Sequence, residues 1–128
     1  MRTFRLDKLV RDKIVESTEA MGGSADHHVL EGEALTTALR NKLDEEIAEL
    51  KNGQESSLEK LADIREVIEA MAVDLGHTIT ELHALQYDKR RKIGGFASGH
   101  FVETVSLPED NQWVDYYAGD PDRFPEVK

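Results

Sequence analysis

The spacing of apolar residues predicts three helices in the middle of the chain. Between residues 33 and 51, leucine and isoleucine recur every three or four positions, which is the spacing of one helix face. A similar pattern follows Ser56 and runs to Leu75, and a third begins after Thr78 and continues to about Lys92. The apolar positions of the three helices are, in order, Leu35, Leu39, Leu43, Ile47 and Leu50; Leu61, Ile64, Ile68, Met71, Ala72 and Leu75; and Ile79, Leu82 and Leu85.

Local signals at the helix ends support the same three elements. Asn52-Gly53, Gly76 and Gly94-Gly95 are typical helix stops, because glycine accepts the left-handed conformation that ends many helices. Ser56 with Glu59, and Thr78 with Glu81, have the spacing of capping boxes, which begin helices. Because the connections are short, we expect antiparallel neighbours and therefore an all-α helical bundle.

The two ends of the chain give weaker signals. Residues 6–21 can hold a short helix before the turn at Gly22-Gly23, and the segments 27–30 and 100–105 are candidates for a small two-stranded β-ribbon. Residues 106–128 contain all three prolines and the only tryptophan. We therefore expect a helical domain over residues 1–105 and an irregular tail over 106–128, which packs Trp113 and Tyr116 or Tyr117 over the bundle.

Composition limits the function further. The chain has 128 residues, no cysteine and a formal net charge of -10, and no stretch has the length of a membrane span or a signal peptide. We therefore expect a soluble cytoplasmic protein that binds neither a nucleic acid polymer nor a membrane. The charge is uneven, since residues 14–88 carry 17 acids against five bases, whereas basic residues gather in 2–13 and 89–92.

Three acids of the central helices are predicted to converge. At about 100° per residue, Glu46 falls inside the apolar face of the first helix and Glu49 lies at its edge. Glu46 and Asp63 are equally far from the turn between the helices, about 9 Å at 1.5 Å per residue, so they lie level in an antiparallel pair. An acid on a core face is either a cation ligand or one half of a buried ion pair. Oxygen ligands without cysteine suit Mg²⁺ or Mn²⁺.

Two further acids of the second helix have open roles. Glu59 is placed either to cap that helix or to bind the metal ion. Glu66 is either a deeper ligand or the base that activates an attacking water molecule.

The motifs also resemble a known family. The segments "DEEIAE" and "LEKLADIREVIEAM" resemble the Glu-Glu-x-x-Glu and Glu-x-x-Asp motifs of the MazG-like all-α nucleoside triphosphate pyrophosphohydrolases. The segments "DKLVRDKI" and "KRRKIGGF" resemble the ends of the phosphoribosyl-ATP pyrophosphohydrolase-like branch, and the similarity runs from about Leu6 to Val105. The resemblance implies a helical bundle, usually dimeric, that binds Mg²⁺ and cleaves a nucleoside triphosphate to monophosphate and pyrophosphate.

Carried over by position, the resemblance assigns Glu46, Glu49 and Asp63 to the metal, with Glu59 as a further candidate. Glu45 and Glu66 are the candidate catalytic residues. The chain departs from the family pattern at Lys60, where a glutamate is expected. Either Glu59 or Glu66 fills the gap, or the site holds fewer metal ions, or Lys60 takes over charge neutralisation and the activity is weak.

The basic clusters are the expected contacts of a nucleotide substrate. Cationic side chains offset the charge of a leaving pyrophosphate, although each basic residue taken alone is equally suited to a surface salt bridge. The aromatic ring after Gly94-Gly95 either stacks on a base or has a core or cap role. The candidate substrate-binding residues are Lys8, Arg11, Lys13, Lys89, Lys92 and Phe96. The leading interpretation is therefore a Mg²⁺-dependent nucleotide pyrophosphohydrolase, with Mn²⁺ as an alternative ion and a homodimer as the assembly. A catalytically weak or inactive nucleotide-binding regulatory bundle is the alternative, and a purely structural module is the third.

Overall fold

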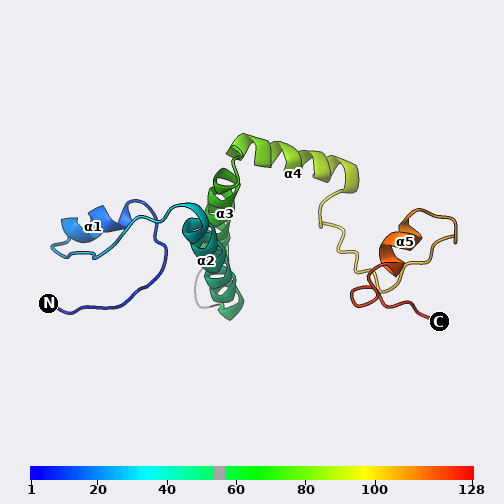
Figure 1. The fold of residues 1–128 in the computed structure, drawn as a ribbon, viewed down its shortest axis with the longest axis horizontal. Helices are drawn as coiled ribbons and strands as arrows, with labels where there is room; N and C mark the ends of the chain where they lie inside the picture. Colours follow the sequence, from blue (N-terminus) through cyan, green and yellow to red (C-terminus); the bar gives the residue numbers. More distant parts are fainter. Residues whose placement is uncertain (54–56) are drawn as a thin grey trace. The chain divides into compact units, whose positions relative to one another are not determined.

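The regular structure is helical throughout the described residues. The computed structural model describes residues 1–53 and 57–128, and the chain divides into two compact units, Met1–Lys92 and Ile93–Lys128 (Figure 1). The helices are α1 (Ile14–Ala20), α2 (Gly32–Asn52), α3 (Ser57–Asp74), α4 (Ile79–Ile93) and α5 (Trp113–Ala118). The all-α prediction is confirmed for the part of the chain that the structure describes.

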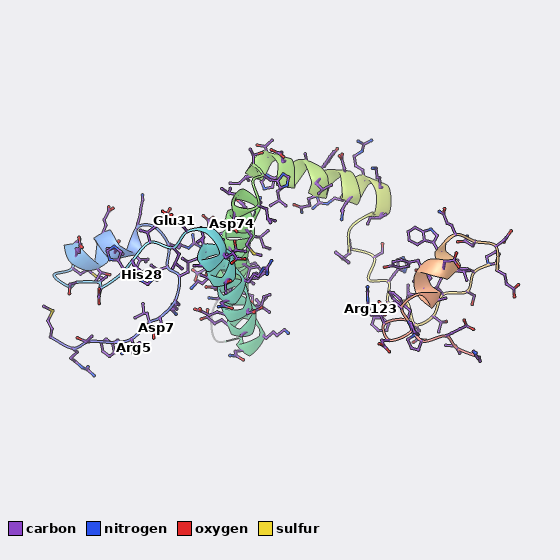
Figure 2. All side chains as sticks on the ribbon, viewed as in Figure 1. Arg5, Asp7, His28, Glu31, Asp74 and Arg123 are labelled. Carbon is purple, nitrogen blue, oxygen red and sulfur yellow. The ribbon has the colours of Figure 1, made fainter. Side chains whose placement is uncertain are left out.

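The first unit is built on the pair formed by α2 and α3, which run side by side in opposite directions (Figure 1). In the described residues of this unit, the buried apolar residues are Leu39 of α2 and Val67 and Ala72 of α3. At the open end of the pair, the Thr36 hydroxyl donates a hydrogen bond of 2.6 Å to the Asp74 carboxylate. Figure 2 labels Asp74 at the end of α3, beside the start of α2. The predicted antiparallel arrangement of these two helices is therefore present.

The predicted helix ends are also present where the structure describes them. Gly53 ends α2 in the left-handed conformation, with a φ of 65°, and Gly76 follows α3 with a φ of 91°. The Thr78 hydroxyl accepts a hydrogen bond from the Glu81 backbone amide at 3.1 Å, and the Glu81 carboxylate accepts one from the Thr78 amide at 3.4 Å. This reciprocal pair is a capping box. The predicted box of Ser56 and Glu59 includes a residue outside the described ranges.

The helix α4 differs from its predicted position. Within the described residues of the first unit, α4 does not pack along α2 or α3 as an antiparallel neighbour. It reaches α3 through His83, whose Nε2 lies 3.3 Å from Nη2 of Arg65 and 3.9 Å from a Glu69 oxygen. The left-handed conformation at Gly76 changes the direction of the chain, and α4 begins anew at the Thr78 cap. The few apolar residues of α4 do not hold it along α3, and Leu85 is exposed.

The predicted β-ribbon is wrong. Residues 27–30 and 100–105 form no strand in the described structure, and the side chains of Val29, Phe101 and Val102 are exposed. A two-stranded ribbon is marginal in water unless it can pack an apolar face on another element. The β-branched residues in these segments therefore favour the strand conformation locally, but they lack the burial that would stabilise a strand.

The second unit contains a small aromatic cluster of its own. The short helix α5 carries Trp113, Tyr116 and Tyr117, and Phe124 follows in the next turn. Edge-to-face contacts join the Trp113 and Tyr116 rings, with centroids 5.5 Å apart, and the Tyr117 and Phe124 rings, at 5.0 Å. The predicted packing of these aromatic rings over the bundle stays a prediction.

No helix in the described residues is long and apolar enough to cross a bilayer.

Candidate functional site: an acid cluster between α2 and α3

Three acids predicted to converge do meet, and a lysine ammonium lies among them. The Nζ atom of Lys60 is 2.9 Å from a carboxylate oxygen of Glu46, 2.5 Å from one of Glu49 and 3.5 Å from one of Asp63. Glu46 and Glu49 come from α2, whereas Lys60 and Asp63 come from α3. We call Glu46, Glu49, Asp63 and Lys60 the acid cluster. Glu46 is thus one half of a buried ion pair, which was one of the two interpretations open from the sequence.

The helix geometry explains why these side chains meet. Lys60 and Asp63 are three residues apart, so they share one face of α3, and the Glu46–Glu49 pair has the same spacing on α2. The side chains of Lys60 and Glu46 are 5% and 8% exposed. An ammonium this deeply buried would cost several kcal/mol if it had no partners. Its three hydrogens can each point to one of the three carboxylates.

Three further basic residues lie at or beside the acid cluster. Lys42 lies 3.3 Å from oxygens of both Glu45 and Glu46. From the N-terminal segment, Lys8 donates a hydrogen bond of 3.0 Å to Glu45, and Arg11 donates one of 2.7 Å to Asp63. The predicted substrate-binding residues Lys8 and Arg11 are therefore at the same place as the predicted metal ligands.

A cleft opens beside two of these basic residues, Lys8 and Lys42. Its volume is about 140 Å³, and it is lined by Asp7, Lys8, Leu9, Ala38, Asn41, Lys42 and Glu45. Lys8, Lys42 and Glu45, which line the cleft, are also joined by the ion pairs described above.

The contact between Lys8 and Glu45 shifts the pKa values of both groups. The hydrogen bond to Glu45 raises the pKa of Lys8 above its ordinary 10.5, and the charge of Glu45 adds to this effect. Partial burial raises the pKa of the Glu45 carboxyl, but hydrogen bonds from Lys8 and Lys42 together outweigh burial and hold it below the ordinary 4.5. The two cationic partners therefore favour the ionised form of Glu45.

The resemblance implies a bound metal ion, so the fit of these side chains to a metal ion is decisive. Carboxylate oxygens are the ligands that Mg²⁺ and Mn²⁺ prefer. However, the Lys60 ammonium lies between Glu46, Glu49 and Asp63, and no group of three or more acids or histidines in the described residues is arranged to hold a metal ion. A divalent ion does not fit among these three acids while Lys60 is there.

The remaining predicted site residues lie outside the acid cluster. Glu59, in the first turn of α3, and Glu66, one turn after Asp63, are both exposed. Lys13 precedes α1, and Lys89 and Lys92 lie on α4. All three lysine side chains are exposed, and Phe96 is exposed in the second unit. The roles of these residues stay predictions.

One basic residue of the site was not predicted. Lys42 precedes Glu45 by three residues and Glu46 by four, which is the spacing of ion pairs on one helix face. That spacing was the available signal.

Comparison with protein-family models gave no match, and comparisons with curated proteins and with solved structures gave none either. The functional argument therefore depends on the residues and their geometry.

Proposed function

We propose that this protein is a nucleotide pyrophosphohydrolase, which cleaves a nucleoside triphosphate or a related nucleotide to the monophosphate and pyrophosphate. The observation that carries the proposal is the meeting of two residue sets that are far apart in the chain. Acids of both predicted motifs lie around one cation, and Lys8 and Arg11 of the N-terminal segment bind acids of the same site. A phosphoanhydride hydrolase needs both signs of charge at one place.

The side chains suit distinct steps of this reaction. Water attacks one phosphorus atom, the bond from that phosphorus to a bridging oxygen breaks, and the water gives up a proton. Glu45 is ionised and lies at the cleft, so it is the proposed acceptor of that proton. Lys8, Lys42 and Arg11 are the proposed contacts of the phosphate oxygens, because phosphate competes well with a carboxylate for ammonium and guanidinium groups.

Magnesium belongs to this proposal as part of the substrate. A triphosphate carries its own divalent ion, which bridges phosphate oxygens and lowers the charge that repels the nucleophile. We therefore propose activity with Mg²⁺, and with Mn²⁺ in its place, on a metal–nucleotide complex. The lack of cysteine favours a reducing compartment, so a cytoplasmic location is part of the proposal.

The test is release of pyrophosphate from a panel of ribo- and deoxyribonucleoside triphosphates with Mg²⁺ or Mn²⁺. We expect equal amounts of monophosphate and pyrophosphate from at least one substrate. Glu45→Gln should lower the rate at least about 100-fold, as loss of a general base does, whereas the exposed neighbour Asp44→Asn should not. A folded protein that releases no pyrophosphate from any member of the panel would contradict the proposal.

The second candidate function is a nucleotide-binding regulatory bundle without turnover. The observation that favours it is Lys60, which lies where the related motif has a glutamate and among the acids expected to bind metal. Calorimetry with a non-hydrolysable triphosphate distinguishes the two functions. Binding without pyrophosphate release, and no activity gained in Lys60→Glu, would select the regulatory bundle.

A homodimer is the proposed assembly. On α3, Leu58, Leu61, Ile68 and Leu75 are between 41% and 78% exposed. Their spacing of three and seven residues makes one apolar seam, with Arg65 and Ala72 at the intervening positions. Water contact along such a seam is unfavourable, and α4 of the same chain does not pack along it in the described residues. A second copy offers the same seam and can cover it.

A further inference from the structure

We infer that Lys60 replaces a resident divalent ion in this protein. Its ammonium is a built-in cation that holds Glu46, Glu49 and Asp63 together, so the acid cluster forms and stays assembled without metal. The inference concerns the same site as the proposed hydrolysis, but it does not require that hydrolysis occurs.

The first support is the fit of the ammonium to the three acids. The Lys60 ammonium donates hydrogen bonds to Glu46 at 2.9 Å and to Glu49 at 2.5 Å and forms an ion pair with Asp63 at 3.5 Å, so it occupies the space between the three carboxylates that a divalent ion would need. The longest contact, to Asp63, is supplemented by Arg11, which donates to the other oxygen of Asp63 at 2.7 Å. Each carboxylate of the acid cluster thus has at least one cationic partner.

The second support is the charge balance of the site. Among the residues that the structure describes, each of the acids Glu45, Glu46, Glu49 and Asp63 lies in ionic contact with at least one of the bases Lys8, Arg11, Lys42 and Lys60. A divalent ion placed among them would add two positive charges beside an ammonium that is 5% exposed and poorly screened by water. To bind there, the ion would first have to expel Lys60, and the buried cluster would lose its existing contacts.

The consequence is a site whose cation cannot dissociate. A carboxylate cage that needs a metal ion is assembled only at sufficient metal concentration. Here the cation belongs to α3, so pairing of α2 with α3 and assembly of the acid cluster are one event. Metal would reach the site only with a ligand that carries it.

The test compares Mn²⁺ binding and thermal unfolding in the wild-type chain and in Lys60→Gln. Mn²⁺ binding is measured by electron paramagnetic resonance, and the unfolding temperature is measured with EDTA and with millimolar Mn²⁺. We expect no change of the wild-type unfolding temperature between the two conditions. Lys60→Gln leaves three acids without their shared cation, so it should bind Mn²⁺ about tenfold more tightly than the wild type, or tighter still. It should also unfold at a higher temperature with Mn²⁺ than with EDTA.

Lys51→Gln is the matched control, because Lys51 is an exposed lysine at the end of the same helix pair. It should behave as the wild type does. A Lys60→Gln variant that folds and gains no Mn²⁺ affinity would overturn the inference. If that variant does not fold, the wild type decides: Mn²⁺ binding that is lost in Glu46→Gln overturns the inference, whereas a wild type that binds no Mn²⁺, or binding that Glu46→Gln leaves unchanged, supports it. Pyrophosphate release is measured separately, so failure of the hydrolase proposal would not be mistaken for failure of this one.

Discussion

At the scale of single residues, the site is a set of charges that satisfy one another. Glu46 lies on the core face of α2, and Lys60 and Lys42 lie 2.9 and 3.3 Å from its carboxylate oxygens. Removing either partner of a buried pair leaves an uncompensated charge, which is costly even where the pair itself adds little net stability. The outer contacts, such as that of Lys8 with Glu45, are wetter and individually weaker.

The contact between Lys8 and Glu45 gives a pH-dependent contribution to stability. The pKa of Glu45 is lowered in the folded chain, so its contribution is present above pH 4.5 and is lost as the pH falls through the folded value. The pKa of Lys8 is raised, so its contribution is present below pH 10.5 and is lost at higher pH. We expect Glu45→Gln to reduce the free energy of unfolding by about 0.5 kcal/mol at neutral pH, since the contact is partly exposed.

Urea unfolding at a series of pH values checks this prediction. The difference between the wild type and Glu45→Gln should shrink as the pH falls below 4.5 and disappear once the pH lies below the lowered pKa of Glu45 in the folded chain. Asp44→Asn serves as the control, with a stability close to that of the wild type. A difference that grows towards low pH would show that Glu45 is not held by cationic partners.

At the scale of elements, local chemistry decides where helices begin and end, and long-range contacts decide what they meet. The helices α2, α3 and α4 were predictable from the sequence because their end signals are local. Gly53 and Gly76 end helices, and the Thr78–Glu81 capping box begins one, through contacts with residues a few positions away. The meeting of Glu46 with Asp63 was also predictable, since an antiparallel pair with a short turn allows few registers. The N-terminal contacts of Lys8 and Arg11 were not, because the path of an irregular segment leaves no periodic trace in the sequence.

The position of Lys60 was only half predictable. Its spacing from Asp63 places both on one face of α3, but the spacing does not say whether the ammonium turns inward or extends to water. The ammonium turns inward because Glu46, Glu49 and Asp63 offer partners to a buried cation. The failed β-ribbon at residues 27–30 and 100–105 has a different cause: its residues favour strands, but the side chains of Val29, Phe101 and Val102 are exposed.

The capping box of α4 gives a prediction for one element. Thr78→Ala removes the hydroxyl that accepts the Glu81 amide, and α4 has little packing along its length to compensate within the described unit. Backbone amides in the first turn of α4 should therefore exchange with solvent about fivefold faster, in line with the usual effect of losing an N-cap. Hydrogen exchange measured by mass spectrometry checks this. Thr80→Ala, an exposed position on the same helix, is the control, and equal exchange in both variants would contradict the assignment.

At the scale of the whole molecule, the exposed seam of α3 matters more than any single contact. The buried apolar residues of the first unit are few, namely Leu39, Val67 and Ala72, whereas Leu58, Leu61, Ile68 and Leu75 lie in water. One chain thus buries less apolar surface than its composition offers, and association is the ordinary remedy.

Substitution within the seam tests the proposed dimer. Light scattering coupled to gel filtration should give about twice the mass of 14.4 kDa for the wild type and the single-chain mass for Ile68→Asp, because a buried aspartate at the seam is unpaired. Val127→Asp is the control, since Val127 is apolar and exposed but lies outside α3. A monomeric wild type, or a dimer indifferent to Ile68→Asp, would contradict the assignment of the interface.

The central claim is that a lysine, and not a metal ion, is the cation among the three acids of a nucleotide-cleaving site. A crystal structure grown with Mn²⁺ and a non-hydrolysable triphosphate tests it most directly, because Mn²⁺ is located by its anomalous scattering. The account predicts that Mn²⁺ is bound to the triphosphate beside Lys8 and Lys42, and that the Lys60 ammonium stays among Glu46, Glu49 and Asp63. A Mn²⁺ peak among those three carboxylates, with Lys60 turned away to solvent, would contradict it.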